Sequence, residues 1–129
     1  MNKMQITRSP LDDSVYVERV LANQQEINRA LNKASQAQKA WRKTSIEQRA
    51  AFCQKMLDAF VGRADEIAEQ LCWMMGRPIR YAKGEVAGME ERARFMIDAA
   101  QAALAPIEMP DKPGFKRYIK REPLGPVFV

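Results

Sequence analysis

Histidine is absent from the sequence, and cysteine occurs only twice among 129 residues. Without histidine, the chain by itself supplies no Ser-His-Asp or Cys-His catalytic arrangement and no histidine-ligated metal site. The two cysteines, Cys53 and Cys72, have neither the number for a disulfide framework nor a metal-ligand spacing. Free thiols are typical of a reducing compartment, so we expect a cytoplasmic protein.

Targeting signals and phosphate-binding loops are also missing. The N-terminal residues MNKMQITRSP lack the apolar core of a signal peptide, and no run of about 18 apolar residues occurs. We therefore expect no membrane partner. Neither GxGxxG nor the P-loop pattern is present. Hydrophobic residues make up 47% and charged residues 29%, which is typical of a folded domain, and the net charge of +5 permits anionic partners without requiring them.

The N-terminal part of the chain predicts a turn, a strand and two helices. Turn-forming residues over 9–14 precede a segment over 15–20 that is rich in β-branched and aromatic residues and predicts a strand. Two helix starts follow, each with a cap residue and a glutamate or glutamine three positions later. These capping boxes are Asn23 with Glu26, and Ser45 with Gln48.

The rest of the chain predicts two more helices and two strands. Helices are expected over 64–76 and 81–104, strands over 115–122 and 127–129, and Gly84 and Gly88 are expected to let another backbone approach the last helix. The predicted fold is mainly α with short β-strands at both ends. We expect a single partial domain over 1–129, with a turn and strand over 9–22, a helical scaffold over 23–104, and a loop and two strands over 105–129.

Apolar residues recur at helical spacing and predict the buried faces. The first helix carries Ile27, Leu31, Ala34, Ala37 and Trp41, and the last carries Val86, Met89, Ala93, Met96, Ile97, Ala100 and Leu104, with Phe95 on the flank. Methionine and tryptophan could line a groove for a partner helix, but they more often fill a core. We expect core positions for Trp41, Trp73, Met74, Met75, Met89 and Met96.

Three groups of residues could carry chemistry, and each also has a structural interpretation. Cys53 and Cys72 could be nucleophiles, but their apolar neighbours predict buried thiols of low reactivity. Four acidic residues on the last helix could form acid-base pairs, but the neighbouring basic residues predict a solvated face. They are Glu85, Glu90, Glu91 and Asp98. The residues alone therefore predict a helical scaffold without catalytic, cofactor-binding or metal-binding residues.

A basic segment near the C-terminal end leaves two interpretations open. It carries Lys112, Lys116, Arg117, Lys120 and Arg121, interleaved with Phe115 and Tyr118. Such a strand could bind single-stranded nucleic acid through phosphate contacts and base stacking. The alternative, which we prefer, is a solvated strand face, so we expect no nucleic-acid partner.

Five short segments, in their order, resemble the N-terminal part of the aldehyde dehydrogenase superfamily over about residues 9–129. They are SPLDDSV at 9–15, AQKAW with EQRA at 37–50, MMGRP at 74–78, GEV at 84–86, and REPLGPV at 121–127. The resemblance implies the N-terminal segment of an α/β fold, in which REPLGPVFV leads into the first strand of the nucleotide-binding fold. It also implies that the strand over 115–122 corresponds to the family's bridging segment, which takes part in subunit contacts.

The resemblance implies that the complete enzyme oxidises an aldehyde to a carboxylic acid with NAD or NADP. The family's Pro-Trp-Asn segment, its cofactor-binding residues, its general-base glutamate and its Gly-Gln-x-Cys nucleophile do not occur in this chain, and neither Cys53 nor Cys72 matches them. We therefore expect this chain to be inactive alone and to bind no cofactor alone.

Two kinds of partner follow from the resemblance. The expected partners are the remainder of the dehydrogenase or other subunits, in a homo-oligomer. The alternative is a stand-alone helical interaction module derived from such an enzyme, which forms mixed oligomers with full-length relatives. In both cases the apolar edge at 127–129 invites pairing with another chain.

Overall fold

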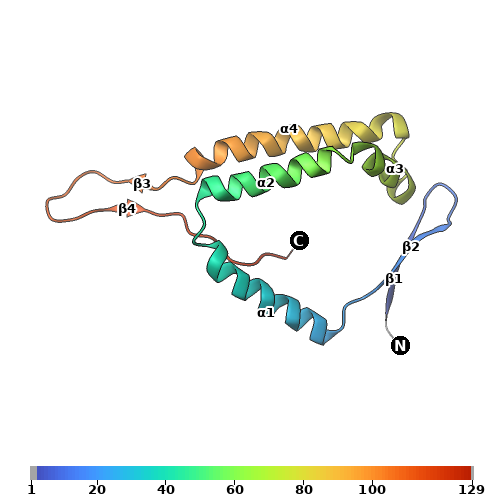
Figure 1. Ribbon diagram of the computed structural model, residues 1–129, viewed down its shortest axis with the longest axis horizontal. Coiled ribbons are helices and arrows are strands. Elements are labelled where there is room, and N and C mark those ends of the chain that lie inside the picture. The colour runs from blue at the N-terminus through green and yellow to red at the C-terminus, as the bar shows by residue number, and fades with distance from the viewer. Residues whose placement is uncertain (1–2, 129) are drawn as a thin grey trace.

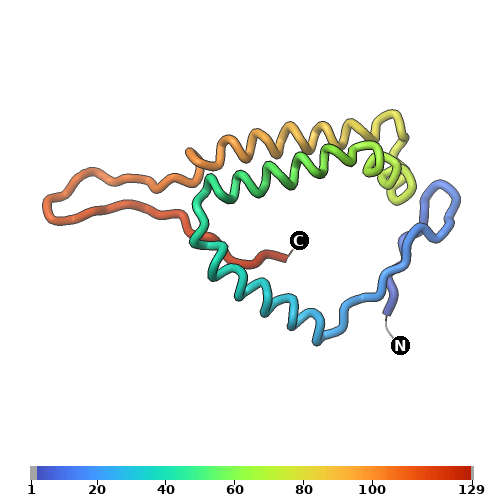
Figure 2. Tube along the Cα trace, viewed as in Figure 1, coloured from blue at the N-terminus to red at the C-terminus, as the bar shows by residue number. Residues whose placement is uncertain are grey.

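The computed structural model describes residues 3–128 and confirms a mainly helical fold with short strands at both ends (Figure 1). The two strand pairs are antiparallel two-stranded sheets. Figure 2 shows the chain running from one sheet through the helices to the other, with the C-terminal segment returning between α1 and the pair α2 and α4 in this view. In chain order the elements are β1 (Met4–Arg8), β2 (Val15–Val20), α1 (Gln24–Trp41), α2 (Ile46–Val61), α3 (Ala64–Met75), α4 (Ile79–Ala103), β3 (Ile107–Glu108) and β4 (Tyr118–Ile119).

The N-terminal strand pair confirms the strand over 15–20 and adds a strand that the sequence pattern did not predict. β1 pairs with β2 from Met4 opposite Val20 to Arg8 opposite Val15, with an irregularity near the turn. The turn is closed by a hydrogen bond from the Ser9 N–H to the Ser14 carbonyl at 2.8 Å. β1 was missed because its stability comes from pairing with β2 rather than from its own composition.

Both predicted capping boxes are present. The Asn23 side chain accepts from the Glu26 N–H at 3.0 Å, and the Glu26 carboxylate accepts from the Asn23 N–H at 2.8 Å. Ser45 and Gln48 make the equivalent pair at 3.2 and 3.0 Å at the start of α2. Each box satisfies two N–H groups that the first turn of a helix leaves without partners, so these helix starts are determined locally.

The core of the described residues is small and lies where α2 and α3 pack against α4. Its buried apolar side chains are Leu57, Ala68, Ala82 and Val86. The prediction for Gly84 and Gly88 was wrong. A Cβ atom at Gly84 would meet nothing within 4 Å, and one at Gly88 would meet only the Arg92 side chain. Within residues 3–128, therefore, no second backbone lies within 4 Å of a Cβ atom placed at either glycine.

Several positions predicted for the core are exposed. Met75 is 72% and Met96 67% exposed, Trp41 and Trp73 are also exposed, and α1 has no buried residue at all. In Figure 1, α1 diverges from the other three helices, and α1 makes no extensive packing contact with any of them. Helical periodicity identified the apolar faces, but a face is buried only where another element covers it.

The strands near the C-terminal end are shorter than predicted. Of the expected strand over 115–122, Tyr118–Ile119 forms a strand, which pairs with β3, a strand that was not predicted, and Phe115 forms an isolated β-bridge with Lys112. Val127 and Phe128 are not in a strand, because no neighbouring strand is there to pair with them, and Val129 lies outside the described residues. Among residues 3–128, no helix is both long and apolar enough to cross a membrane.

Candidate functional site

A large groove lies between α1, the start of α2 and the C-terminal segment. It has a volume of about 600 Å³. Its walls include Ala37 and Trp41 of α1, Phe52 of α2, and Pro126 and Val127. The rings of Trp41 and Phe52 are 5.6 Å apart and tilted by 47°, which is a favourable aromatic geometry. This surface is almost entirely apolar, so it suits packing better than binding of a polar substrate.

A tight turn between α1 and α2 builds this groove. Thr44 Oγ1 donates to the Trp41 carbonyl at 2.6 Å, and the Ser45 capping box starts α2 immediately afterwards. The hydroxyl occupies a carbonyl that the end of α1 leaves without a helical partner. Trp41 and Phe52 therefore meet because the sequence closes the turn with local hydrogen bonds.

A second apolar groove, of about 260 Å³, lies between α2 and α4 and contains Cys53. The neighbouring lining residues are Arg49 and Ala50 on α2, and Met96 and Ile97 on α4. The prediction of a buried Cys53 was wrong, because its side chain is exposed, whereas Cys72 is half-buried. Within residues 3–128, Cys53 shares this groove with apolar side chains and arginine, and no acid or base that could activate a thiol lines it.

The acidic side chains of α4 are separated rather than gathered into a catalytic pair. Glu85 forms an ion pair with Arg77 at 2.6 Å, and Glu90 forms one with Arg94 at 2.6 Å. Arg94 also reaches Asp58 of α2 at 3.1 Å, and these hydrogen bonds, first to Glu90, raise the pKa of Arg94. The network ties α2 to α4 and leaves Glu90 committed to a structural contact.

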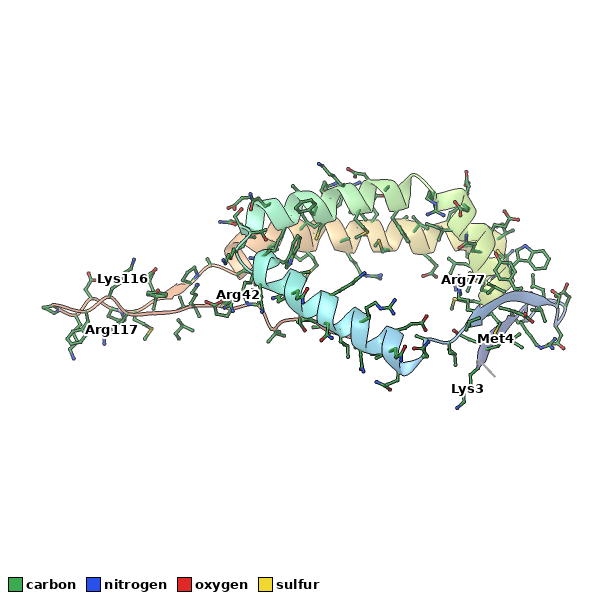
Figure 3. The ribbon with its side chains drawn as sticks, turned by 60° about the horizontal axis from the view of Figure 1, so that its bottom comes forward. Lys3, Met4, Arg42, Arg77, Lys116 and Arg117 are labelled. Carbon is green, nitrogen blue, oxygen red and sulfur yellow. The ribbon has the colours of Figure 1, made fainter. Side chains whose placement is uncertain are left out.

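The hairpin over residues 107–122, here called the arm, carries the basic segment. Figure 3 shows Lys116 and Arg117 far from the helices and Arg42 near the base of the arm. Arg117 and Arg121 donate to backbone carbonyls of Pro110 and Ala105, respectively. Lys116 lies over the Tyr118 ring at 5.8 Å, as Lys112 does over Phe115 at 5.0 Å. Both aromatic rings are thus partly covered by the chain's own lysines, which favours the solvated interpretation over base stacking.

At the base of the arm, Glu122 bridges two basic side chains. Its Oε1 pairs with Lys120 Nζ at 2.7 Å and its Oε2 with Arg42 Nη2 at 3.3 Å. The hydrogen bond from Lys120, followed by that from Arg42, lowers the pKa of Glu122. The segment REPLG is therefore attached to the end of α1 before it enters the large groove.

No group of three or more potential metal ligands occurs within the part of the chain that the structure describes. The described chain also contains no glycine-rich turn between a strand and a helix, the feature that binds the pyrophosphate in a Rossmann-type dinucleotide site. Gly84 and Gly88 lie inside α4, and Gly62 and Gly76 end helices.

Comparison with known proteins gives consistent results. The model of the aldehyde dehydrogenase family matches residues 2–129. The 3,6-anhydro-alpha-L-galactose dehydrogenase of Streptomyces coelicolor is 29% identical over 119 residues, which is 92% of this chain and 24% of the relative. The malonate-semialdehyde dehydrogenase of Bacillus pumilus is 29% identical over 118 residues, 91% of this chain and 24% of the relative. The chain therefore spans about a quarter of the length of these curated relatives.

Solved structures show the same fold. The NADP-dependent glyceraldehyde-3-phosphate dehydrogenase of Bacillus halodurans, complexed with NADP, superposes with a TM-score of 0.82 at 25% identity, covering 95% of this chain and 27% of that one. PnpE in complex with nicotinamide adenine dinucleotide has a TM-score of 0.84 at 24% identity, covering 95% and 25%.

Proposed function

The chain belongs to the aldehyde dehydrogenase family, and from that premise we propose that it is the N-terminal scaffold of an NAD(P)-dependent enzyme that oxidises an aldehyde to a carboxylic acid. The observation that carries the proposal is the family match over residues 2–129. The names of relatives support it, because they include dehydrogenases of small aldehydes and one that is specified as using NADP(+). We further propose a cytoplasmic location, which the free thiols favour.

The large exposed surface supports a scaffolding role. The chain has an accessible surface of 10872 Å², whereas a compact monomer of its mass would expose about 6,900 Å². This excess surface includes large exposed apolar side chains on the N-terminal hairpin, on all four helices and on the arm. We propose that the cofactor-binding part of the enzyme covers α1 and the large groove, and that another subunit of a homo-oligomer covers the arm.

In this proposal the chain positions the catalytic part and takes no step in the chemistry. The apolar segment Pro126–Phe128 would enter the nucleotide-binding sheet from the large groove, at a place determined by Trp41 and Phe52. NAD or NADP would accept the hydride in the complete enzyme, bound by residues outside this chain. Which aldehyde is oxidised depends on residues outside this chain as well.

The experiment compares two proteins: the product of the complete reading frame that contains this chain, and residues 1–129 alone. Both are mixed with several aldehydes and with NAD⁺ or NADP⁺, and formation of the reduced cofactor is followed by absorbance. The expected result is turnover by the complete product and none by the 129-residue chain. Turnover by the 129-residue chain alone would refute the scaffold role. A complete product that never reduces either cofactor would refute the proposed dehydrogenase activity.

The exposed surface also favours a second candidate function, an interaction module that joins mixed oligomers. Under this hypothesis the 129-residue chain associates with full-length relatives without any activity of its own. Co-expression of the tagged chain with a full-length relative tests this directly. Recovery of both proteins in one complex of defined mass would support the module, and a relative that never copurifies with the chain would exclude it.

A further inference from the structure

We propose that Arg121 and Glu122 form a two-sided clamp that holds the arm at a fixed angle to the helices. Arg121 Nη1 donates to the Ala105 carbonyl at 2.6 Å, and Glu122 Oε2 accepts from Arg42 Nη2 at 3.3 Å. Ala105 lies just beyond the end of α4, and Arg42 is the C-cap of α1. Two consecutive side chains therefore attach the base of the arm to the ends of two different helices.

Within residues 3–128, little else determines the direction of the arm. β3 and β4 are joined by only two residue pairs, and neither strand makes an extensive contact with a helix of the described chain. Figure 1 shows the arm extending away from the helices. A two-stranded ribbon of this kind is marginally stable by itself. Without the clamp, the two connections at its base would be the main restraint on its angle.

The Glu122 carboxylate is oriented by two contacts. Glu122 uses different oxygens for its two partners, Oε1 for Lys120 on the arm and Oε2 for Arg42 on the helix side. The Lys120 contact holds the carboxylate with its second oxygen toward Arg42. Each exposed ion pair of this kind contributes little stability, although charge-assisted hydrogen bonds are stronger than neutral ones. Two contacts on separate helices restrain rotation of the arm more than one contact does.

This inference concerns the chain's own contacts and does not depend on the dehydrogenase proposal. Its consequence for assembly is that Phe115 and Tyr118, both exposed on the arm, point in a constant direction. A surface that pairs with another subunit benefits from this, because less conformational entropy is lost on association.

Distance measurement between two nitroxide labels tests the clamp. The full-length protein is labelled at native Cys53 on α2 and at Lys112→Cys on the arm, with all other cysteines replaced. The protein is diluted until light scattering gives the mass of one subunit, so that every measured distance lies within a single subunit. We expect a single narrow distance distribution. The variants Arg121→Gln and Arg42→Gln should each broaden it, and the double variant should broaden it most.

The matched control is Arg117→Gln, which removes the same kind of arginine–carbonyl hydrogen bond, but within the arm. Its distribution should keep the parent width. Raising the salt to about 1 M, where charges are screened within about 3 Å, should broaden the parent and leave Arg42→Gln nearly unchanged. Circular dichroism verifies that all variants keep their helices.

A double variant with the parent's distribution would overturn the clamp, and so would an Arg117→Gln variant as broad as Arg121→Gln. Neither result bears on enzyme activity. Conversely, the absence of dehydrogenase activity would predict no change in the distance distributions, so each proposal can be refuted without the other.

Discussion

Gly76 ends α3 beside Pro10 of the N-terminal hairpin, and its replacement by alanine should be among the costliest single-methyl changes in the chain. Gly76 is the C-cap of α3 with φ of 69°, a left-handed conformation. An L-residue pays about 1–2 kcal/mol to adopt it. A Cβ atom at this position would also lie 3.1 Å from Pro10 Cγ, closer than ordinary carbon contacts.

The two effects predict a total cost of about 2–3 kcal/mol for Gly76→Ala, since forcing an extra methyl into a packed site costs about 1 kcal/mol or more. Urea unfolding followed by circular dichroism and by tryptophan fluorescence, to which both Trp73 on α3 and Trp41 contribute, measures this free energy. Truncating the partner, Pro10→Ala, removes the closest atom. Gly76→Ala should therefore cost less in the Pro10→Ala background, with a coupling of about 0.5–1 kcal/mol.

Gly114→Ala is the matched control. Gly114 also has a positive φ, 79°, but a Cβ atom there would meet nothing within 4 Å. It should therefore show the backbone cost without the contact cost. The reasoning is refuted if Gly76→Ala costs no more than Gly114→Ala, or if Pro10→Ala leaves the cost of Gly76→Ala unchanged.

Three further predictions follow from burial, charge and exposed surface. Leu57→Ala, at a site with 0% exposure, should lower the free energy of unfolding in urea by about 2–5 kcal/mol. Leu124→Ala, at 97% exposure, should be near neutral in the 129-residue chain, and equal costs for the two variants would contradict the described core. The Glu122 carboxyl should titrate below its ordinary value of 4.5, so its contribution to stability is present above that pH and is lost as pH falls through the lowered pKa. NMR titration should show a larger rise of the Glu122 pKa in Lys120→Gln than in Arg42→Gln, and no rise in either variant would disprove the bridge. The 129-residue chain should self-associate in light scattering as its concentration rises, because its surface greatly exceeds that of a compact monomer; a clean monomer at high concentration would argue against it.

The helix starts and ends could be predicted because their causes lie within a few residues. Asn23 and Ser45 each find a partner three positions along the chain, and Gly76 ends α3 because it tolerates the left-handed conformation. The strands were predicted less well. β1 and β3 are strands because they pair with β2 and β4, and no pattern within Met4–Arg8 or Ile107–Glu108 predicts that pairing.

The candidate surfaces were only half predictable. Periodicity placed Trp41 on an apolar face and Cys53 on another, but both were assigned to a core and both are exposed. The clamp at Arg121 and Glu122 had no sequence signal, because Arg42 precedes Glu122 by 80 positions. Basic and acidic residues on an exposed segment resemble any solvated face until the fold brings particular ones together.

By itself, the sequence determined the two capped helix starts, the apolar faces and the family, since these depend on local hydrogen bonds, on periodicity and on the order of short motifs. The tertiary structure alone decided which of those faces are covered, where the arm leaves the helices and which charged side chains meet. The physical reason is that burial and ion pairing depend on distances in space between residues far apart in the chain, and helical periodicity contains no information about those distances.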